Sequence, residues 1–220
     1  TPLFQGFVVI SAFCLPALLI TSVAAYYYDR GMGAYERNNL RGADDALDTA
    51  RRIAPVFDTV QIAQADLNVK RLFSSAAGND GERAALIDKT GKILDEAQRM
   101  NPLRPDVYLL RGHMQLVDTR IDTNKQAVAA LAEYTKALAL DPRFSEARVA
   151  MSIVLARTGD NAGAHKLLEQ GMAYAYVDSP ELLQYVRLTA QVRKQSGDTE
   201  GSLQLAARAN AIEQKIAGRR

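Results

Sequence analysis

One pattern recurs three times along the chain: an amphipathic segment that carries a small residue near its end and stops at a proline. The segments read ALDTARRIAP, ILDEAQRMNP and YTKALALDP, and their prolines are Pro55, Pro102 and Pro142. Apolar positions recur in them at helical spacing, and proline cannot continue a helix because it lacks a backbone N–H. A pattern that returns at a roughly regular interval predicts an all-α protein built from repeated helix pairs.

These endings resemble the second helix of the tetratricopeptide repeat (TPR), a 34-residue helix pair with small residues where its two helices cross. The resemblance implies a helical-hairpin solenoid of about five repeats over residues 24–216. Its repeats would span 24–57, 58–104, 105–144, 145–178 and 183–216. The positions that carry the resemblance are small residues and prolines: Gly31, Ala43, Ala50, Pro55, Ala97, Pro102, Gly112, Ala130, Ala137, Pro142, Ala164, Gly171 and Ala209.

The spacing between the prolines exceeds the repeat length of the family. The extra residues fall at 74–82 and 118–124, between the helices of a pair. Solenoids absorb insertions in loops, so we expect both segments to be solvent-facing loops.

An apolar run extends from Leu3 to Tyr28, and the first charged side chain is Asp29. As a helix, this run would be about 39 Å long, enough to cross the roughly 30 Å hydrocarbon layer of a membrane. A secretory signal peptide is the alternative, but no Lys or Arg precedes the run, and it is longer than the usual apolar region of a signal. We therefore predict a transmembrane or assembly-core helix over 1–28.

The repeat pattern places the first solenoid helix at about Ala24, inside the apolar run. No linker separates the two, so we expect one long apolar helix that runs directly into the solenoid. The small residues Ala17, Thr21 and Ala25 recur every four positions and would allow a second helix to approach closely. Pro16 should kink this helix, and neighbouring protein should accommodate it.

In TPR proteins, the first helix of each repeat lines a concave face. The resemblance places a mostly apolar set of side chains there: Tyr28, Met32, Tyr35, Ile62, Leu109, His113, Val149 and Ile153. Such a groove suits an apolar or amphipathic helical segment of a partner protein. The alternative is that many of these side chains form the core between repeats.

No pattern in the sequence supports catalysis. The 27 basic and 25 acidic residues nearly cancel, so nucleic acid is not an expected partner. Cys14, His113 and His165 do not make up a zinc ligand set. Gly31-x-Gly33 follows no strand and lacks the third glycine of a nucleotide-binding fingerprint. We expect no metal, no cofactor and no enzymatic activity.

An apolar helix that continues into RGMGAYERNNLRGADDALDTARRIAP is similar to the last membrane helix and TPR tail of bacterial O-antigen ligase and polymerase-like proteins. The resemblance implies a bacterial membrane or cell-surface location with the solenoid on the extracytoplasmic side. Arg30, Arg37 and Arg41 favour the cytoplasmic side instead, by the positive-inside rule. The transferase body of that family is absent from this sequence, so no glycosyl transfer is implied.

Two functions remain after these exclusions. The preferred one is a subunit of a self-assembling surface structure, pilus-like or filamentous, with apolar helices packed inside and solenoids outside. The alternative is a single-span membrane-anchored TPR adaptor that binds a partner protein. The expected partners are further copies of the chain, membrane lipid, and a helical protein segment in the groove.

Overall fold

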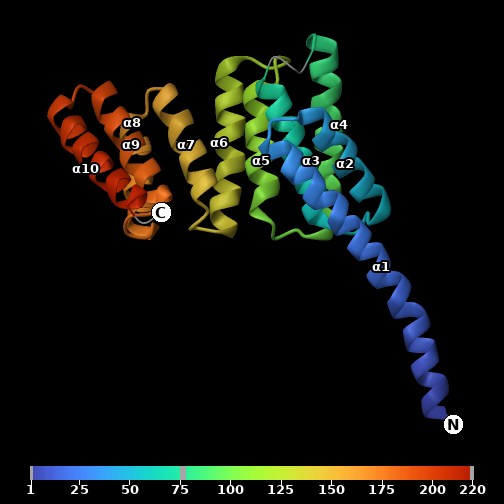
Figure 1. The fold of residues 1–220 in the computed structure, drawn as a ribbon. Coiled ribbons are helices and arrows are strands. Elements are labelled where there is room, and N and C mark those ends of the chain that lie inside the picture. Colours follow the sequence, from blue (N-terminus) through green and yellow to red (C-terminus); the bar gives the residue numbers. More distant parts are fainter. Residues whose placement is uncertain (1, 75–77, 219–220) are drawn as a thin grey trace. The chain divides into compact units, whose positions relative to one another are not determined.

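The computed structural model describes the backbone of residues 2–74 and 78–218, and the side chains of these residues from position 18 onward. Within these ranges the chain is helical, with no strand, as expected (Figure 1). The helices in chain order are α1 (Pro2–Glu36), α2 (Leu40–Ile53), α3 (Asp58–Phe73), α4 (Asp80–Met100), α5 (Pro105–Val117), α6 (Thr123–Leu140), α7 (Ser145–Arg157), α8 (Asn161–Tyr174), α9 (Pro180–Gln195) and α10 (Thr199–Ala217).

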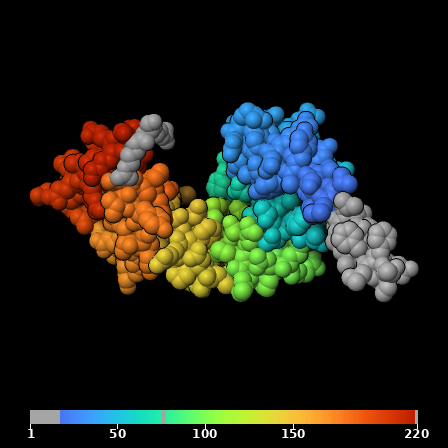
Figure 2. Space-filling view, turned by 60° about the horizontal axis from the view of Figure 1, so that its bottom comes forward, coloured from blue at the N-terminus to red at the C-terminus, as the bar shows by residue number. Residues whose placement is uncertain are grey.

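Consecutive helices pair into hairpins, with α1 against α2, α3 against α4, α7 against α8 and α9 against α10 (Figure 1). Figure 2 shows the described part of α1 and α2, both in blue, packed together beside the teal α3. This arrangement follows from the amphipathic pattern, because each helix has one apolar face that only a neighbouring helix can cover.

The hairpins belong to two compact units. Unit 1 comprises Thr1–Leu110 and Val117–Thr119, and unit 2 comprises Arg111–Leu116 and Arg120–Arg220. The sequence pattern predicts a single solenoid over 24–216 and does not reveal this division. In repeat proteins each hairpin contacts only its neighbours, so nothing in the local pattern marks where one group of hairpins ends. The limits of the individual repeats stay a prediction.

The helix ends have clear local causes. Helices α2, α4 and α6 end two residues before Pro55, Pro102 and Pro142, which confirms the predicted stop signals. The helices α2, α4, α6, α8 and α10 each follow an Asn or Asp residue whose side chain accepts a hydrogen bond from a free N–H in the first turn. These N-cap residues are Asn39, Asn79, Asp122, Asp160 and Asp198.

The two predicted loops are shorter than expected. Asn79 and Glu82 form a capping box, so α4 begins at Asp80 and takes in residues 80–82. Asp122 caps α6 in the same way, and α6 therefore includes residues 123 and 124. Residues 75–77 of the first predicted loop lie outside the described part of the chain. Residues 78–82 are exposed to solvent, as expected.

Small residues occupy the helix crossings. A Cβ atom added to Gly112 would overlap the ring of Tyr134, and one added to Gly171 would overlap the ring of Tyr185. Both tyrosines are fully buried, so their rings cannot move aside. The alanines of the repeat pattern are also buried, at 0–3% exposure: Ala43, Ala50, Ala97, Ala130, Ala137, Ala164 and Ala209. Close helix approach therefore rests on the absence of larger side chains.

Helix α1 is continuous, but the prediction of a long apolar N-terminal helix needs correction. Over its described side chains α1 carries Asp29, Arg30 and Glu36. Among the described residues, no helix combines the length and the apolar character that a membrane span requires. The prediction depends on the apolar residues 3–17, whose side chains lie outside the described part of the chain.

Two buried polar side chains hold the proline turns in place. Gln61 on α3 donates from Nε2 to the carbonyl of Pro55 at 2.8 Å. Arg148 on α7 donates to the carbonyl of Pro142, and also to Gln170 Oε1 at 3.1 Å. Gln61 and Arg148 each follow their proline by six residues. The same kind of contact therefore fixes the turn before α3 and the turn before α7. The sequence pattern does not reveal it.

Candidate protein-binding groove

A groove of about 270 Å³ opens in unit 1 between α1, α3 and the first half of α5. Its lining combines apolar side chains with two carboxylates and one guanidinium group. The lining residues are Tyr28, Met32, Thr59, Ile62, Ala63, Asp66, Arg104, Asp106, Leu109 and Leu110. Concave sites with an apolar surface and a few placed polar groups are the usual form of ligand-binding sites on proteins.

Apolar side chains form the floor of the groove. Ile62 and Leu109 are 9% and 8% exposed, and they are held in place by the packing of α3 and α5. Tyr28 and Met32 on α1 remain half-buried and pack beside a core cluster that includes Leu67. A ligand side chain that covered them would remove apolar surface from water, which favours binding by about 25 cal/mol per Å².

Asp66 supplies one carboxylate of the groove. The Tyr35 hydroxyl donates to Asp66 Oδ2 at 2.7 Å, and the Lys70 ammonium lies 4.1 Å from the centre of the Tyr35 ring. Burial, and then the neighbouring Asp66 carboxylate, raise the pKa of the Tyr35 hydroxyl well above its ordinary value. Tyr35 therefore stays a neutral donor that orients Asp66.

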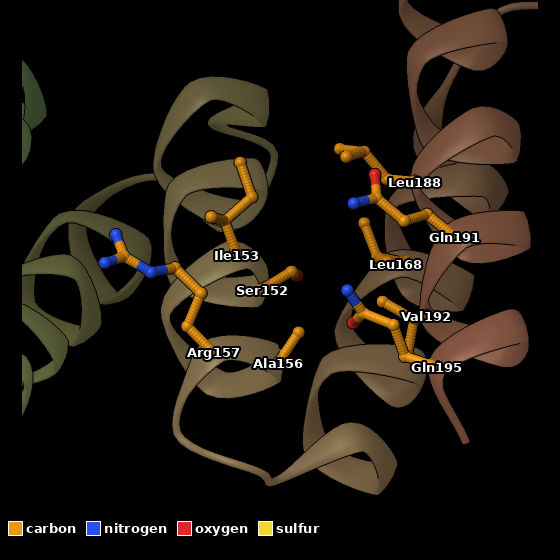
Figure 3. Close-up of a pocket in the computed structure, with 9 residues that line it drawn as sticks. All are labelled: Ser152, Ile153, Ala156, Arg157, Leu168, Leu188, Gln191, Val192 and Gln195. Atoms are coloured by element: carbon orange, nitrogen blue, oxygen red, sulfur yellow. The ribbon is translucent and has the colours of Figure 1, made fainter.

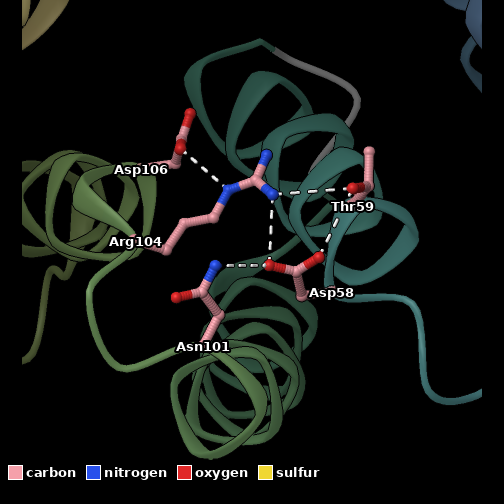
Figure 4. A network of polar contacts seen from close by, with 5 residues as sticks. All are labelled: Asp58, Thr59, Asn101, Arg104 and Asp106. Carbon is pink, nitrogen blue, oxygen red and sulfur yellow. Dashed lines mark hydrogen bonds and ion pairs between the residues drawn. The ribbon is translucent and has the colours of Figure 1, made fainter.

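Asp106 supplies the second carboxylate, as part of a network at the end of the groove (Figure 4). Arg104 donates from Nε to Asp106 Oδ2 at 3.0 Å and from Nη1 to Asp58 Oδ2 at 3.1 Å. Asn101 Nδ2 also donates to Asp58 Oδ2, at 3.1 Å. The network joins the turn before α5 to the start of α3.

The network also sets the charge of its members. Partial burial raises the pKa of Asp58, but the hydrogen bond from Asn101 and the charge of Arg104 outweigh it, so the pKa lies below its ordinary value. Partial burial lowers the pKa of Arg104, and its contacts with Asp106 and Asp58 more than reverse this. Both groups are therefore charged at neutral pH, with one cation between two anions.

The structure brings four of the predicted groove residues together. Tyr28, Met32, Ile62 and Leu109 line the groove of unit 1, and Tyr35 contacts it through Asp66. Asp58, Asn101 and Arg104 are not among the residues predicted from the sequence. A sequence signal for Arg104 exists, because it lies two residues after Pro102, in the turn that leads into α5.

The other three predicted groove residues belong to unit 2 and do not form one site. The ring of His113 packs edge-on against Tyr134, with centroids 5.7 Å apart. Val149 is buried in a core cluster with Leu168 and Tyr185. His113 and Val149 therefore pack against neighbouring side chains, as in the alternative that such residues form the core between repeats.

Ile153 lines a cleft between α7 and α9 in unit 2 (Figure 3). This cleft measures about 70 Å³, several times less than the groove of unit 1. The side chains of Gln191 and Gln195 point from α9 toward α7. We place the candidate site in unit 1, because its groove joins apolar side chains to two carboxylates and the described residues that line this cleft include no carboxylate.

The residues predicted to mediate assembly lie on α1. Thr21 is half-buried and its hydroxyl donates to the Leu18 carbonyl at 2.9 Å, while Ala25 is exposed. The side chains of Pro16 and Ala17 lie outside the described residues. Leu18 and Leu19 are 62% and 65% exposed, so this part of α1 presents apolar surface in the isolated chain.

A sequence profile of the tetratricopeptide repeat matches residues 123–192, from the start of α6 into α9. The chain has a TPR fold. No curated protein matches it in sequence. Among the described residues, no cluster of three or more metal-binding side chains occurs.

Several solved TPR structures share the fold. A thermophilic TPR protein of Thermus thermophilus aligns over 89% of this chain and 97% of its own, with a TM-score of 0.67 and 14% identity. PilW, described as a widely conserved type IV pilus biogenesis factor, aligns over 87% of this chain and 78% of its own, with a TM-score of 0.63 and 15% identity. YrrB, described as having an unusual peptide-binding site, aligns over 86% and 85%, with a TM-score of 0.50 and 16% identity.

At these identities the likeness shows the TPR fold and no shared partner. It confirms the predicted all-α TPR-like architecture. The similarity to O-antigen ligase and polymerase-like proteins stays a prediction.

Proposed function

We propose that this TPR protein is a non-catalytic interaction scaffold whose unit 1 groove binds a segment of a partner protein. The observation that carries the proposal is the joining of an apolar floor, Ile62 and Leu109, to two carboxylates, Asp66 and Asp106, in one concavity. TPR proteins as a class bind peptides or proteins, and YrrB, which shares the fold, is described as having a peptide-binding site.

The chemistry of the groove selects the class of ligand. Its apolar floor suits a branched or aromatic side chain, and Asp66 and Asp106 suit a Lys or Arg nearby on the same segment. Arg104 already offsets part of the negative charge, so one basic group on the ligand is enough. We propose an amphipathic helical segment with apolar and basic residues as the partner.

We further propose that the apolar run at residues 3–28 anchors the scaffold, as a membrane-anchored adaptor. The support is the absence of charge before Asp29 and the exposed apolar side chains of Leu18, Leu19 and Tyr26. An extracytoplasmic position at a bacterial membrane is part of this proposal and rests on the O-antigen ligase resemblance alone.

A defined peptide pair tests the groove. A labelled amphipathic helix with leucine on one face and lysine on the other should bind the full chain in detergent, measured by fluorescence anisotropy. The same peptide with glutamate in place of lysine should bind at least about tenfold more weakly, a difference of about 1.4 kcal/mol. Equal binding of both peptides would contradict the role of Asp66 and Asp106.

A variant of the groove floor completes this test. Ile62→Lys removes apolar surface and adds a cation that repels the basic peptide, while its long side chain can reach water. We expect binding to fall at least about tenfold. Val128→Lys is the matched control, because Val128 is 68% exposed on α6 in unit 2. If the control weakens binding equally, the peptide does not occupy the groove.

Self-assembly through α1 is the second candidate, and the face that carries Thr21 and Ala25 favours it. Small side chains let two helices pack closely, and the Thr21 hydroxyl is satisfied within its own helix. We propose that copies would pack along this face in a filament. Thr21→Leu should then abolish filaments seen by electron microscopy, whereas Ser22→Leu, on an exposed neighbouring position, should not. Filaments that persist in Thr21→Leu would rule out this packing.

A further inference from the structure

The point at which α1 leaves unit 1 can be located from the helix register. A Cβ atom added to Gly31 would lie 2.8 Å from Leu47 Cγ, so these residues are opposite one another in the hairpin of α1 and α2. Because the hairpin is antiparallel, Ala24 lies level with Ala54 at the end of α2, and both are buried. The part of α1 before Val23 therefore extends beyond the end of α2.

The two proline turns of unit 1 lie at this same end. The turn between α2 and α3 contains Val56 and Phe57 and follows the end of α2 directly. The turn between α4 and α5 is joined to the start of α3, because Asn101 and Arg104 both donate to Asp58 (Figure 4). Three parts of the chain far apart in sequence thus share one edge.

That edge carries exposed apolar side chains at its turns. Val56 is 73% exposed, Leu103 is 72% exposed, and Phe57 and Met100 are each 38% exposed. We call these four residues the turn edge. Single exposed apolar residues are common on proteins, but a group of them beside an emerging apolar helix marks an interaction surface.

The charges around the turn edge suit the surface of a lipid bilayer. Arg52 and Arg99 lie in the last turns of α2 and α4, immediately before the two turns, and Arg52 is also paired with Asp48. Exposed apolar side chains flanked by arginines are typical of protein segments that sit at the boundary between headgroups and acyl chains. Arg104 lies between Asp58 and Asp106 and offsets one of their two negative charges at this edge.

We propose that the turn edge rests on a lipid bilayer around the point where α1 enters it. This inference rests on the proposed anchoring by α1, and it adds a second, peripheral contact that orients unit 1. Thr59 and Asp106 of the groove lie in the first turns of α3 and α5, and Arg104 directly precedes α5. Tyr28 lies about one turn further along α1 than Ala24. A partner segment in the groove is therefore held close to the lipid surface.

Lipid quenching of site-specific labels tests the contact in the full chain. In a Cys14→Ser background, Val56→Cys and Leu103→Cys receive an environment-sensitive fluorophore, and the protein is reconstituted into phosphatidylcholine vesicles. A nitroxide on the lipid headgroup should quench labels at positions 56 and 103 at least about twice as strongly as a control label, since interfacial segments bury about 5–10 Å into this region. The control is Glu36→Cys, exposed at the opposite end of the hairpin.

The outcomes separate this inference from the anchoring itself. If the protein floats with the vesicles but the labels at positions 56 and 103 are quenched no more than the control label, the anchor is in place and the turn-edge contact is overturned. Failure to float would overturn both. A blue shift at positions 56 and 103 without lipid quenching would show that protein covers the edge, and would also overturn the proposal. Adding Val56→Glu to the protein labelled at position 103 should return its quenching to the control value.

Discussion

Replacing Ala137 by leucine should lower the free energy of unfolding by about 2–3 kcal/mol, because the added carbons have no space at the helix crossing. Ala137 is 0% exposed on α6, on the same helix as the fully buried Tyr134. The three added carbons must displace the neighbouring helices or force a strained rotamer. Calorimetry should show the transition of unit 2 shifted by several degrees to lower temperature.

The matched control for this change is Ala139→Leu, an exposed position two residues further along α6. Alanine and leucine have similar helix propensity, so the control should change stability by less than about 0.5 kcal/mol. In unit 1, Ala97→Leu and the exposed Ala85→Leu form the equivalent pair. Unchanged stability in both buried variants would show that the crossings are looser than the structure indicates.

The second large effect concerns buried amide groups on α3. Gln64 and Asn68 are both 0% exposed, and neither side-chain amide has a hydrogen-bond partner among the described residues. A buried polar group without a partner costs about 1–3 kcal/mol, because it has left water without a replacement. The double change Gln64→Met and Asn68→Leu keeps the side-chain shapes closely similar and removes these polar atoms. We expect the free energy of unfolding to rise by about 2 kcal/mol or more.

Urea unfolding of the full chain measures this gain. The matched controls are Gln184→Met on α9 and Asn210→Leu on α10. Both residues are exposed and lie away from the buried amides of α3. The same chemical changes at these sites should alter stability little. A loss of stability in the buried double variant would mean that the amides form hydrogen bonds in the folded chain, and the apparent lack of partners would then be wrong.

Much of the candidate site could be predicted from the sequence. The repeat pattern placed Tyr28, Met32, Ile62 and Leu109 on first helices, and these side chains share the groove of unit 1. The pattern could not separate His113 and Val149 from them, because packing residues and groove residues occupy the same register on a helix. Only the neighbours of each side chain distinguish the two.

The sequence by itself determined the helices and their ends. Proline after α2, α4 and α6 stops each helix through its own missing N–H, and Asn or Asp begins each second helix through a bond within one turn. These causes act within a few residues, so they can be read from the chain.

The tertiary structure alone decided three other features: the division into two units within α5, the burial of Gln64 and Asn68, and the meeting of Asp58 with Arg104. Polar side chains are expected at the surface, and Asp58 and Arg104 are separated by a complete helix pair. The physical reason is that such contacts depend on how whole helices pack, and the side chains that meet across a packed interface leave no mark on the local pattern of either helix.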